Sequence, residues 1–354
     1  MPDIKENPFT LDFGRSPSII IPRTSIMDDL IQLFTSEVSS QQSALITGIR
    51  GCGKTVFMTL VSKKLSVQPE WIIVELSPQQ GLLQSLIIKL GYEEKVRPIL
   101  NEAKINPAHF GAQFGIDESE PIPDPETALE RLLEGLRRHQ KRLLVTIDDI
   151  ASNKDIRMFI RIYQLLLRKE LPIYLLMTGL YENVRALQDD KHPPFLSHIP
   201  QISLGPLNIG AIADSYQQIF HLEQTEALIM ARETRGYSFA FQVLGYLCWK
   251  YPEDESKVRR MYAQFLEEYV YEKIWADLSP VERNVAAAIA RTPDGNVKNI
   301  REKARMTTNQ FSPYRKRLIR KGLVDENTYG KLRFVLPLFE NFVLESTEFS
   351  PIYD

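Results

Sequence analysis

The sequence predicts an α/β fold built on a parallel sheet, followed by an all-helical lid and a small C-terminal domain. Three observations support this prediction. Apolar runs typical of strands alternate with helical patterns up to residue 205, a glycine-rich motif follows the first run, and helical patterns alone fill residues 206–276. Alternating strands and helices are typical of a parallel sheet covered on both faces. A chain of 354 residues is long enough for two or three domains.

The individual elements follow from the pattern of apolar residues. Strands are expected at residues 43–47, 71–76, 142–147, 172–178 and 200–204, with helices at 54–66, 81–90, 125–140 and 155–169. The lid is expected to contain helices at 207–220, 224–234, 238–250 and 255–276. Residues 106–125 are rich in Pro and acidic residues, so we expect a long connection there, with a short hairpin as an alternative.

The stretch GIRGCGKT, residues 48–55, has the spacing of a phosphate-binding loop. Glycines let backbone N–H groups turn toward phosphates, Lys54 would reach the β and γ oxygens, and the Thr55 hydroxyl would bind Mg²⁺. The loop stands between an expected strand and an expected helix, which is the context that such a loop requires. We therefore predict ATP or ADP as ligand, held by Gly48, Gly51, Gly53, Lys54, Thr55 and Val56.

A second motif, LLVTIDDI at residues 143–150, ends a predicted strand with two carboxylates. Asp148 is the candidate for the water shell of the Mg²⁺ ion, and Asp149 is the candidate general base that polarises the attacking water. Thr178 ends the next predicted strand. Two roles are open for its hydroxyl. It could hydrogen-bond the γ-phosphate or the attacking water, or it could be buried and hydrogen-bond a backbone group.

Composition limits where the protein functions. No apolar run approaches the roughly 18 to 20 residues that a membrane helix needs, and the N-terminus lacks the layout of a signal peptide. The two cysteines, Cys52 and Cys248, do not make a disulfide framework or a zinc site. We expect a reduced, cytoplasmic protein without a membrane partner.

The C-terminal part carries an excess of positive charge. Between Val281 and Val335 there are 13 Lys+Arg and 5 Asp+Glu, a net charge of +8, whereas the rest of the chain has a net charge of −10. A basic domain on an acidic body indicates that the two parts meet different partners.

The same part has the pattern of a winged helix-turn-helix. Ser279, Pro280 and Glu282 predict a capping box that starts a first helix. A second helix is expected at 297–305 and a third within FSPYRKRLIRKGL, beginning at either Thr308 or Ser312. Strands at 323–324 and 332–335 would flank the wing, DENTYG. The start of the third helix decides whether Asn309 and Gln310 can face bases.

We expect the third helix to enter the major groove of double-stranded DNA and the wing to contact phosphates. Winged helices also bind proteins, and a charged helix face is often only solvated, so a protein partner is the alternative. The basic residues of the third helix, Lys321 included, are expected to face outward. The candidate DNA contacts are Asn309, Arg315, Lys316, Arg317, Arg320, Lys331 and Arg333.

Taken together, the segments NPF…IIIPR…IMDDLIQLF, TGIRGCGKT, LLVTIDDI and GYSFAFQVLGYLCW resemble AAA+ ATPases. The resemblance is to the bacterial and archaeal group with an origin-recognition-like ATPase domain and a C-terminal winged helix; STAND ATPases share the two aspartates. It implies the sheet order 5-1-4-3-2, a nucleotide between sheet and lid, and Ile20, Ile21 and Arg23 beside the adenine. The expected domains are 1–205, 206–276 and 277–354.

Two features depart from this family. The family often has an arginine just after the glycine of GYSFAF, but Tyr237, Ser238 and Phe239 stand here and the nearest arginine is Arg235. An arginine finger is also not identifiable, since His198 stands where one would be sought and Arg185 is a weak candidate. Because such arginines accelerate hydrolysis by about 10³ or more, we expect slow turnover.

These features favour a slow ATPase, or a switch between ATP and ADP, that controls DNA binding. A nucleotide-dependent homo-oligomer is compatible with this function. The alternative is a STAND-like switch whose winged helix binds a protein partner. A metabolic kinase is disfavoured because no motif for a phosphate acceptor is visible.

Overall fold

The computed structural model describes residues 6–12, 16–36, 41–78, 81–111, 124–188, 199–325 and 329–348. The chain forms two compact units. The first, here named the sheet unit, comprises Thr24–Thr47 and Lys54–Ser203; the second, the helical unit, comprises Met1–Arg23, Gly48–Gly53 and Leu204–Asp354. The GIRGCGKT motif is divided between Gly53 and Lys54. Residues 48–53 belong to the helical unit, and Lys54 and Thr55 belong to the sheet unit.

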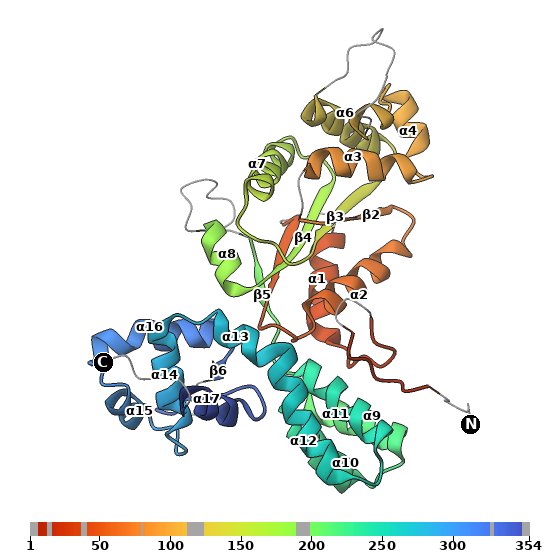
Figure 1. Ribbon diagram of the computed structural model, residues 1–354. Coiled ribbons are helices and arrows are strands. Elements are labelled where there is room, and N and C mark those ends of the chain that lie inside the picture. The colour runs from red at the N-terminus through yellow and green to blue at the C-terminus, as the bar shows by residue number, and fades with distance from the viewer. Residues whose placement is uncertain are drawn as a thin grey trace. The chain divides into compact units, whose positions relative to one another are not determined.

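The sheet unit contains five parallel strands (Figure 1). They are β1 (Ser43–Thr47), β2 (Trp71–Leu76), β3 (Arg142–Ile147), β4 (Ile173–Gly179) and β5 (Gln201–Ser203). Their order, β2-β3-β4-β1-β5, is the expected order 5-1-4-3-2 and confirms the predicted α/β P-loop fold. Thr47 pairs with Gly179, and Ile147 pairs with Met177. The carboxyl ends of β1, β3 and β4 therefore lie side by side.

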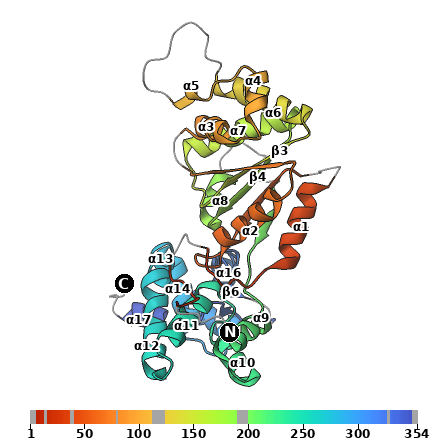
Figure 2. The same cartoon turned by 90° about the vertical axis from the view of Figure 1, so that its right-hand side faces the viewer.

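Helices cover both faces of this sheet (Figure 2). One face packs against α3 (Leu82–Tyr92), α6 (Pro125–Arg138) and α7 (Lys154–Arg168), and Leu175 and Met177 of β4 belong to that core. On the other face lie α1 (Thr24–Thr35) and α2 (Lys54–Ser66), where Phe34 contacts Tyr174 at a ring distance of 5.6 Å. Burial on both faces explains why the strands are continuous apolar runs.

Five helices of the described residues were not predicted from the sequence. They are α1, α4 (Arg97–Glu102), α5 (Ala108–Gly111), α8 (Tyr181–Gln188) and α17 (Phe339–Glu348). The connection at 106–125 was expected to be irregular, but it begins with the helical turn α5. The Asn106 side chain accepts the N–H of Ala108 at the start of this turn. Residues 112–123, where the hairpin alternative fell, lie outside the described residues.

The helical unit begins with the expected lid helices. These are α9 (Ile209–Phe220), α10 (Gln224–Glu233), α11 (Ser238–Lys250) and α12 (Glu255–Leu266). The last predicted helix, 255–276, is helical throughout, with a π-helical turn at Glu267–Tyr271 between α12 and α13 (Glu272–Ala276). Within this turn the Tyr271 hydroxyl donates a hydrogen bond to the carbonyl of Pro337.

The following residues, here named the C-terminal segment (279–348), contain, in their described part, three helices, a two-stranded antiparallel ribbon and a fourth helix. They are α14 (Pro280–Ala290), α15 (Val297–Lys303), α16 (Thr308–Arg320), β6 (Val324–Asp325) and β7 (Arg333–Phe334), and α17 follows. The Ser279 capping box is present as predicted. Thr307 caps α16 in a second capping box with Gln310, so the earlier of the two expected starts is correct. Wing residues 326–328 lie outside the described residues.

Of the helices in the described parts of the chain, none combines the length and apolar character required to cross a membrane.

Candidate functional site

Four predicted site residues of the sheet unit meet at the carboxyl ends of its strands. The Thr55 hydroxyl, in the first turn of α2, donates to Oδ2 of Asp148 at 2.7 Å. The Thr178 hydroxyl donates to Oδ1 of the same carboxylate. It also accepts the backbone N–H of Asp149 at 2.9 Å. The sequence spacing between these residues is large, and the adjacent strand ends bring them together.

The two aspartates have different surroundings. Asp148 is half-buried and bonded through both oxygens, whereas Asp149 is exposed. The backbone of Asp149 has a φ of 50°, in the left-handed region that aspartate tolerates better than most residues. The N–H bond to Thr178 holds this turn, so the Asp149 carboxylate projects from a fixed backbone.

Thr178 is completely buried. Its hydroxyl accepts the backbone N–H of Asp149 and donates to the Asp148 carboxylate. The bond to Asp149 is the role of a buried threonine that hydrogen-bonds the backbone. Thr178 thus orients both aspartates.

The oxygen donors of this site are suited to Mg²⁺, which prefers hydroxyl, carboxylate, water and phosphate oxygens. Among the described residues, no group of three or more His, Cys, Asp and Glu side chains could hold a metal ion. Thr55 and Asp148 are the residues that would hold such an ion.

Residues 48–53 of the motif belong to the helical unit, where three consecutive carbonyl groups are bonded to the start of α11. The Arg50 carbonyl accepts the Tyr237 hydroxyl at 2.6 Å. The Gly51 carbonyl accepts the Phe239 N–H at 3.2 Å, and the Cys52 carbonyl accepts the Ser238 hydroxyl at 2.9 Å. These bonds use carbonyl groups, whereas phosphate binding requires the N–H groups of the loop.

Two loop glycines are required by geometry. Gly51 has a φ of 75° and Gly53 a φ of 91°, values that favour glycine. A Cβ atom on Gly51 would also lie 2.2 Å from the Tyr237 hydroxyl oxygen. Cys52 is buried. In the sheet unit, Lys54 and Val56 are half-buried in the first turn of α2.

The residues expected beside an adenine also lie in the helical unit. Arg23 Nη2 donates to the carbonyls of Cys52 and Gly205 at 3.0 and 2.8 Å. Burial lowers the pKa of its guanidinium. Ile21 is buried in the lid core with Phe9 and Phe241, and Ile20 is half-buried. The described contacts thus place Arg23 on the carbonyl side of the loop; its position relative to an adenine stays a prediction.

The arginines considered for catalysis have other contacts. Arg235 bonds the carbonyls of Phe334 and Leu336 and the carboxylate of Glu340, all in the C-terminal segment. Arg185 is exposed on α8. His198 lies outside the described residues.

The predicted DNA contacts differ in exposure. Asn309, Lys316, Arg320 and Arg333 are exposed, while Arg315, Arg317 and Lys331 are half-buried. The Arg317 guanidinium lies over the Tyr314 ring, 5.3 Å from its centre.

Lys321 was expected to face outward and does not. It is only 7% exposed, and its ammonium lies 3.2 Å from the Glu282 carboxylate, which is itself 2% exposed. Lys321 is the C-cap of α16 and keeps a helical backbone, with a φ of −66° and a ψ of −13°. It therefore shares a face of the helix with the buried Leu318, three residues earlier, and lies against Glu282 of α14. The sequence showed Glu282 as a capping residue but gave no sign of this pairing.

We expect Glu282→Gln to lower the free energy of unfolding by about 3 kcal/mol at pH 7, because Lys321 would stay buried without its counter-charge. Burial raises the pKa of Glu282, but hydrogen bonds from Ser279 and the Lys321 ammonium outweigh this and bring the pKa below its ordinary value of 4.5. The stabilisation is therefore complete above that value and is lost as pH falls through the folded-state pKa.

Urea unfolding at pH 7 and at lower pH values tests this expectation. The difference between wild type and Glu282→Gln should shrink on acidification. The exposed Glu302→Gln, on α15, serves as control. A Glu282 variant as stable as this control at pH 7 would contradict the importance of the pair.

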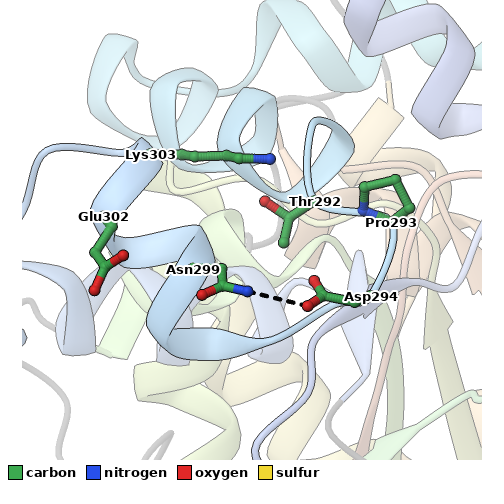
Figure 3. Close-up of a pocket in the computed structure, with 6 residues that line it drawn as sticks. All are labelled: Thr292, Pro293, Asp294, Asn299, Glu302 and Lys303. Atoms are coloured by element: carbon green, nitrogen blue, oxygen red, sulfur yellow. Dashed lines mark hydrogen bonds between the residues drawn. The ribbon is translucent and has the colours of Figure 1, made fainter.

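An open depression of about 700 Å³ lies beside α15 in the C-terminal segment (Figure 3). Four of its polar side chains bond to the protein itself. Asn299 Nδ2 donates to Asp294 Oδ2 at 3.0 Å, Thr292 donates to the Ala288 carbonyl, and Lys303 donates to the Arg291 carbonyl. We assign no ligand to this depression.

Comparisons with known proteins agree with this architecture. A family model described as a domain of unknown function (DUF8462) matches residues 268–343. No curated protein matches the chain. The solved structure of a Walker-type ATPase of Pyrococcus abyssi is similar over 95% of this chain and 100% of that chain, with 13% identity and a TM-score of 0.64.

Two further solved structures are similar at lower scores. Cdc6p from Pyrobaculum aerophilum covers 95% of this chain and 97% of its own, with 14% identity and a TM-score of 0.48. The ORC2 protein of Aeropyrum pernix covers 96% and 98%, with 16% identity and a TM-score of 0.43. The likeness to the Walker-type ATPase shows a shared α/β fold built on the five-stranded parallel sheet.

Proposed function

We propose that this protein binds ATP and Mg²⁺ and acts as a slow ATPase, or as a switch between ATP and ADP, that controls DNA binding by its C-terminal segment. The main support is the convergence of Thr55, Asp148, Asp149 and Thr178 next to a phosphate-loop sequence. A fold shared with a Walker-type ATPase is consistent with this function but does not establish it.

Each residue of the site has a role in this proposal. Lys54 would bind the β and γ oxygens, and the Thr55 hydroxyl would hold Mg²⁺ in place of its present bond to Asp148. Asp148 would lie in the water shell of this ion. Asp149 polarises the attacking water, and Thr178 orients the two aspartates. A Mg²⁺ ion held there would supply neutralisation of the phosphate charge.

Asp149→Asn is expected to keep ATP binding and to lower the turnover rate by about 10² or more, because the amide cannot accept the proton of the attacking water. Single-turnover hydrolysis and ATP affinity should be measured together. Asp155→Asn, which alters a carboxylate at the start of α7, is the matched control. Unchanged turnover in Asp149→Asn would place the base elsewhere.

The proposal of DNA binding is supported by the charge of the C-terminal segment and by its order of elements, three helices followed by an antiparallel ribbon. Helix α16 would be the recognition helix of a winged helix-turn-helix, with exposed Asn309 in its first turn and exposed Lys316 and Arg320 beyond it.

A titration against a mixed-sequence DNA duplex tests the function. It should be made with ATP, ADP or no nucleotide, at two salt concentrations. We expect binding that depends on the nucleotide and weakens steeply with salt. Absence of DNA binding in every state would reject this output and favour a STAND-like switch with a protein partner.

A further inference from the structure

The junction between α10 and α11 makes contacts on two sides. This stretch, Thr234–Phe239, is here named the clamp. On one side its last three residues bond the carbonyl groups of Arg50, Gly51 and Cys52. The lid thus holds the phosphate loop through the backbone carbonyl groups of the loop. The lid residues that do so follow Gly236, where the AAA+ family often has an arginine.

On its other side the clamp is bonded to the C-terminal segment through Arg235. Its Nη1 donates to the carbonyls of Phe334 at 3.1 Å and Leu336 at 2.9 Å. The same nitrogen lies 2.9 Å from Oε1 of Glu340. Phe334 ends β7, Leu336 lies in the connection that follows, and Glu340 is in the first turn of α17. Arg235 therefore joins the clamp to the ribbon and to the last helix.

Only Gly236 separates the two sets of contacts, and the backbone there is closely constrained. Gly236 has a φ of 75°, and its carbonyl accepts the Leu207 N–H at 2.7 Å. The buried Thr234 hydroxyl accepts the Gly236 N–H at 3.1 Å and donates to the Ala231 carbonyl at 2.6 Å. Displacement of the loop carbonyls therefore cannot be absorbed between Tyr237 and Arg235 without breaking these bonds.

The phosphate loop also contacts the C-terminal segment directly. Ile49 packs against the hydrophobic core that contains Leu318 and Phe334. A Cβ atom on Gly322, just beyond α16, would lie 3.9 Å from both Cβ and N of Ile49. The end of the candidate recognition helix thus lies next to the loop, as part of one compact unit.

We propose that the clamp couples the occupancy of the phosphate loop to the conformation of the C-terminal segment. Phosphate binding reorients the loop N–H groups and, with them, the carbonyls of the same peptide planes. Tyr237, Ser238 and Phe239 follow these carbonyls, and Arg235 carries the displacement to β7 and α17. Arg235 is a positioning residue in this scheme and does not touch the nucleotide. The inference rests on the proposed ATP binding but not on DNA as the partner.

Hydrogen exchange of the full-length protein, with and without Mg²⁺-ATP, tests this coupling. In the wild type, ATP should change the exchange of residues 48–53 and also of residues 333–341. In Arg235→Met, the change at 48–53 should persist while the change at 333–341 is lost, because the variant lacks the bonds that join the two sites. Arg259→Met is the control, because Arg259 pairs with Glu255 and Glu233 inside the lid.

Arg235→Lys provides a second variant in case the methionine variant does not fold. Lysine keeps a positive charge for Glu340, but its side chain is shorter and its ammonium cannot replace the bonds to both carbonyls. The exchange response at residues 333–341 should therefore fall in this variant too. An undiminished response at 333–341 in a folded Arg235 variant, or no response there in an ATP-bound wild type, would overturn the coupling alone. A wild type that binds no ATP would overturn the proposed function and the coupling together.

Discussion

Replacing Lys54 with alanine is expected to weaken ATP binding by about ten- to a hundredfold, because hydrogen bonds to a charged group contribute roughly 1.5 to 3 kcal/mol. In the proposed function this ammonium is the point charge that binds the β and γ oxygens. The lost affinity should therefore be larger for ATP than for ADP, and isothermal titration of both nucleotides would measure it.

Lys63→Ala is the matched control for this experiment. Lys63 is an exposed lysine in the last turn of the same helix, α2, so its removal changes net charge and helix composition in the same way. The control should bind ATP like the wild type. Equal affinities of the Lys54 and Lys63 variants would remove the basis for a nucleotide site at GIRGCGKT.

The strands of the sheet unit could be predicted closely because their physical signal is local. β1, β2 and β3 have the expected bounds, and β4 differs by one residue at each end. Such strands are buried on both faces and appear in the sequence as unbroken apolar runs. Helices α4, α5 and α8 have four to eight residues, too few for a helical period to be recognised.

The candidate site was predictable for a related reason. Asp148 and Thr178 each end a predicted strand, and parallel strands place their carboxyl ends at one edge of a sheet. The clamp could not be predicted in this way. The bond between Tyr237 and Arg50 joins residues 187 positions apart, and the pairing of Lys321 with Glu282 joins the end of α16 to α14. Such contacts are set by tertiary packing, which leaves no periodic trace in the sequence.

Charge reversal on α16 should have the largest effect on DNA binding. In the double variant Lys316→Glu and Arg320→Glu, both altered residues are exposed one turn apart on the candidate recognition helix. If each cation neutralises one phosphate, their loss should lower the slope of log affinity against log salt by about 1.8. We also expect at least about a tenfold loss of affinity at low salt, because the introduced carboxylates repel the phosphates.

The double variant Arg259→Glu and Arg260→Glu separates this contact from a general effect of charge. Both arginines are exposed on lid helix α12, so the net charge of the protein changes by the same amount at a different place. Fluorescence anisotropy with one DNA duplex over a series of salt concentrations would give both slopes. If α16 carries the phosphate contacts, only its variant loses slope. Equal losses would mean that long-range attraction dominates, and an unchanged slope in the α16 variant would show that this helix face does not contact DNA.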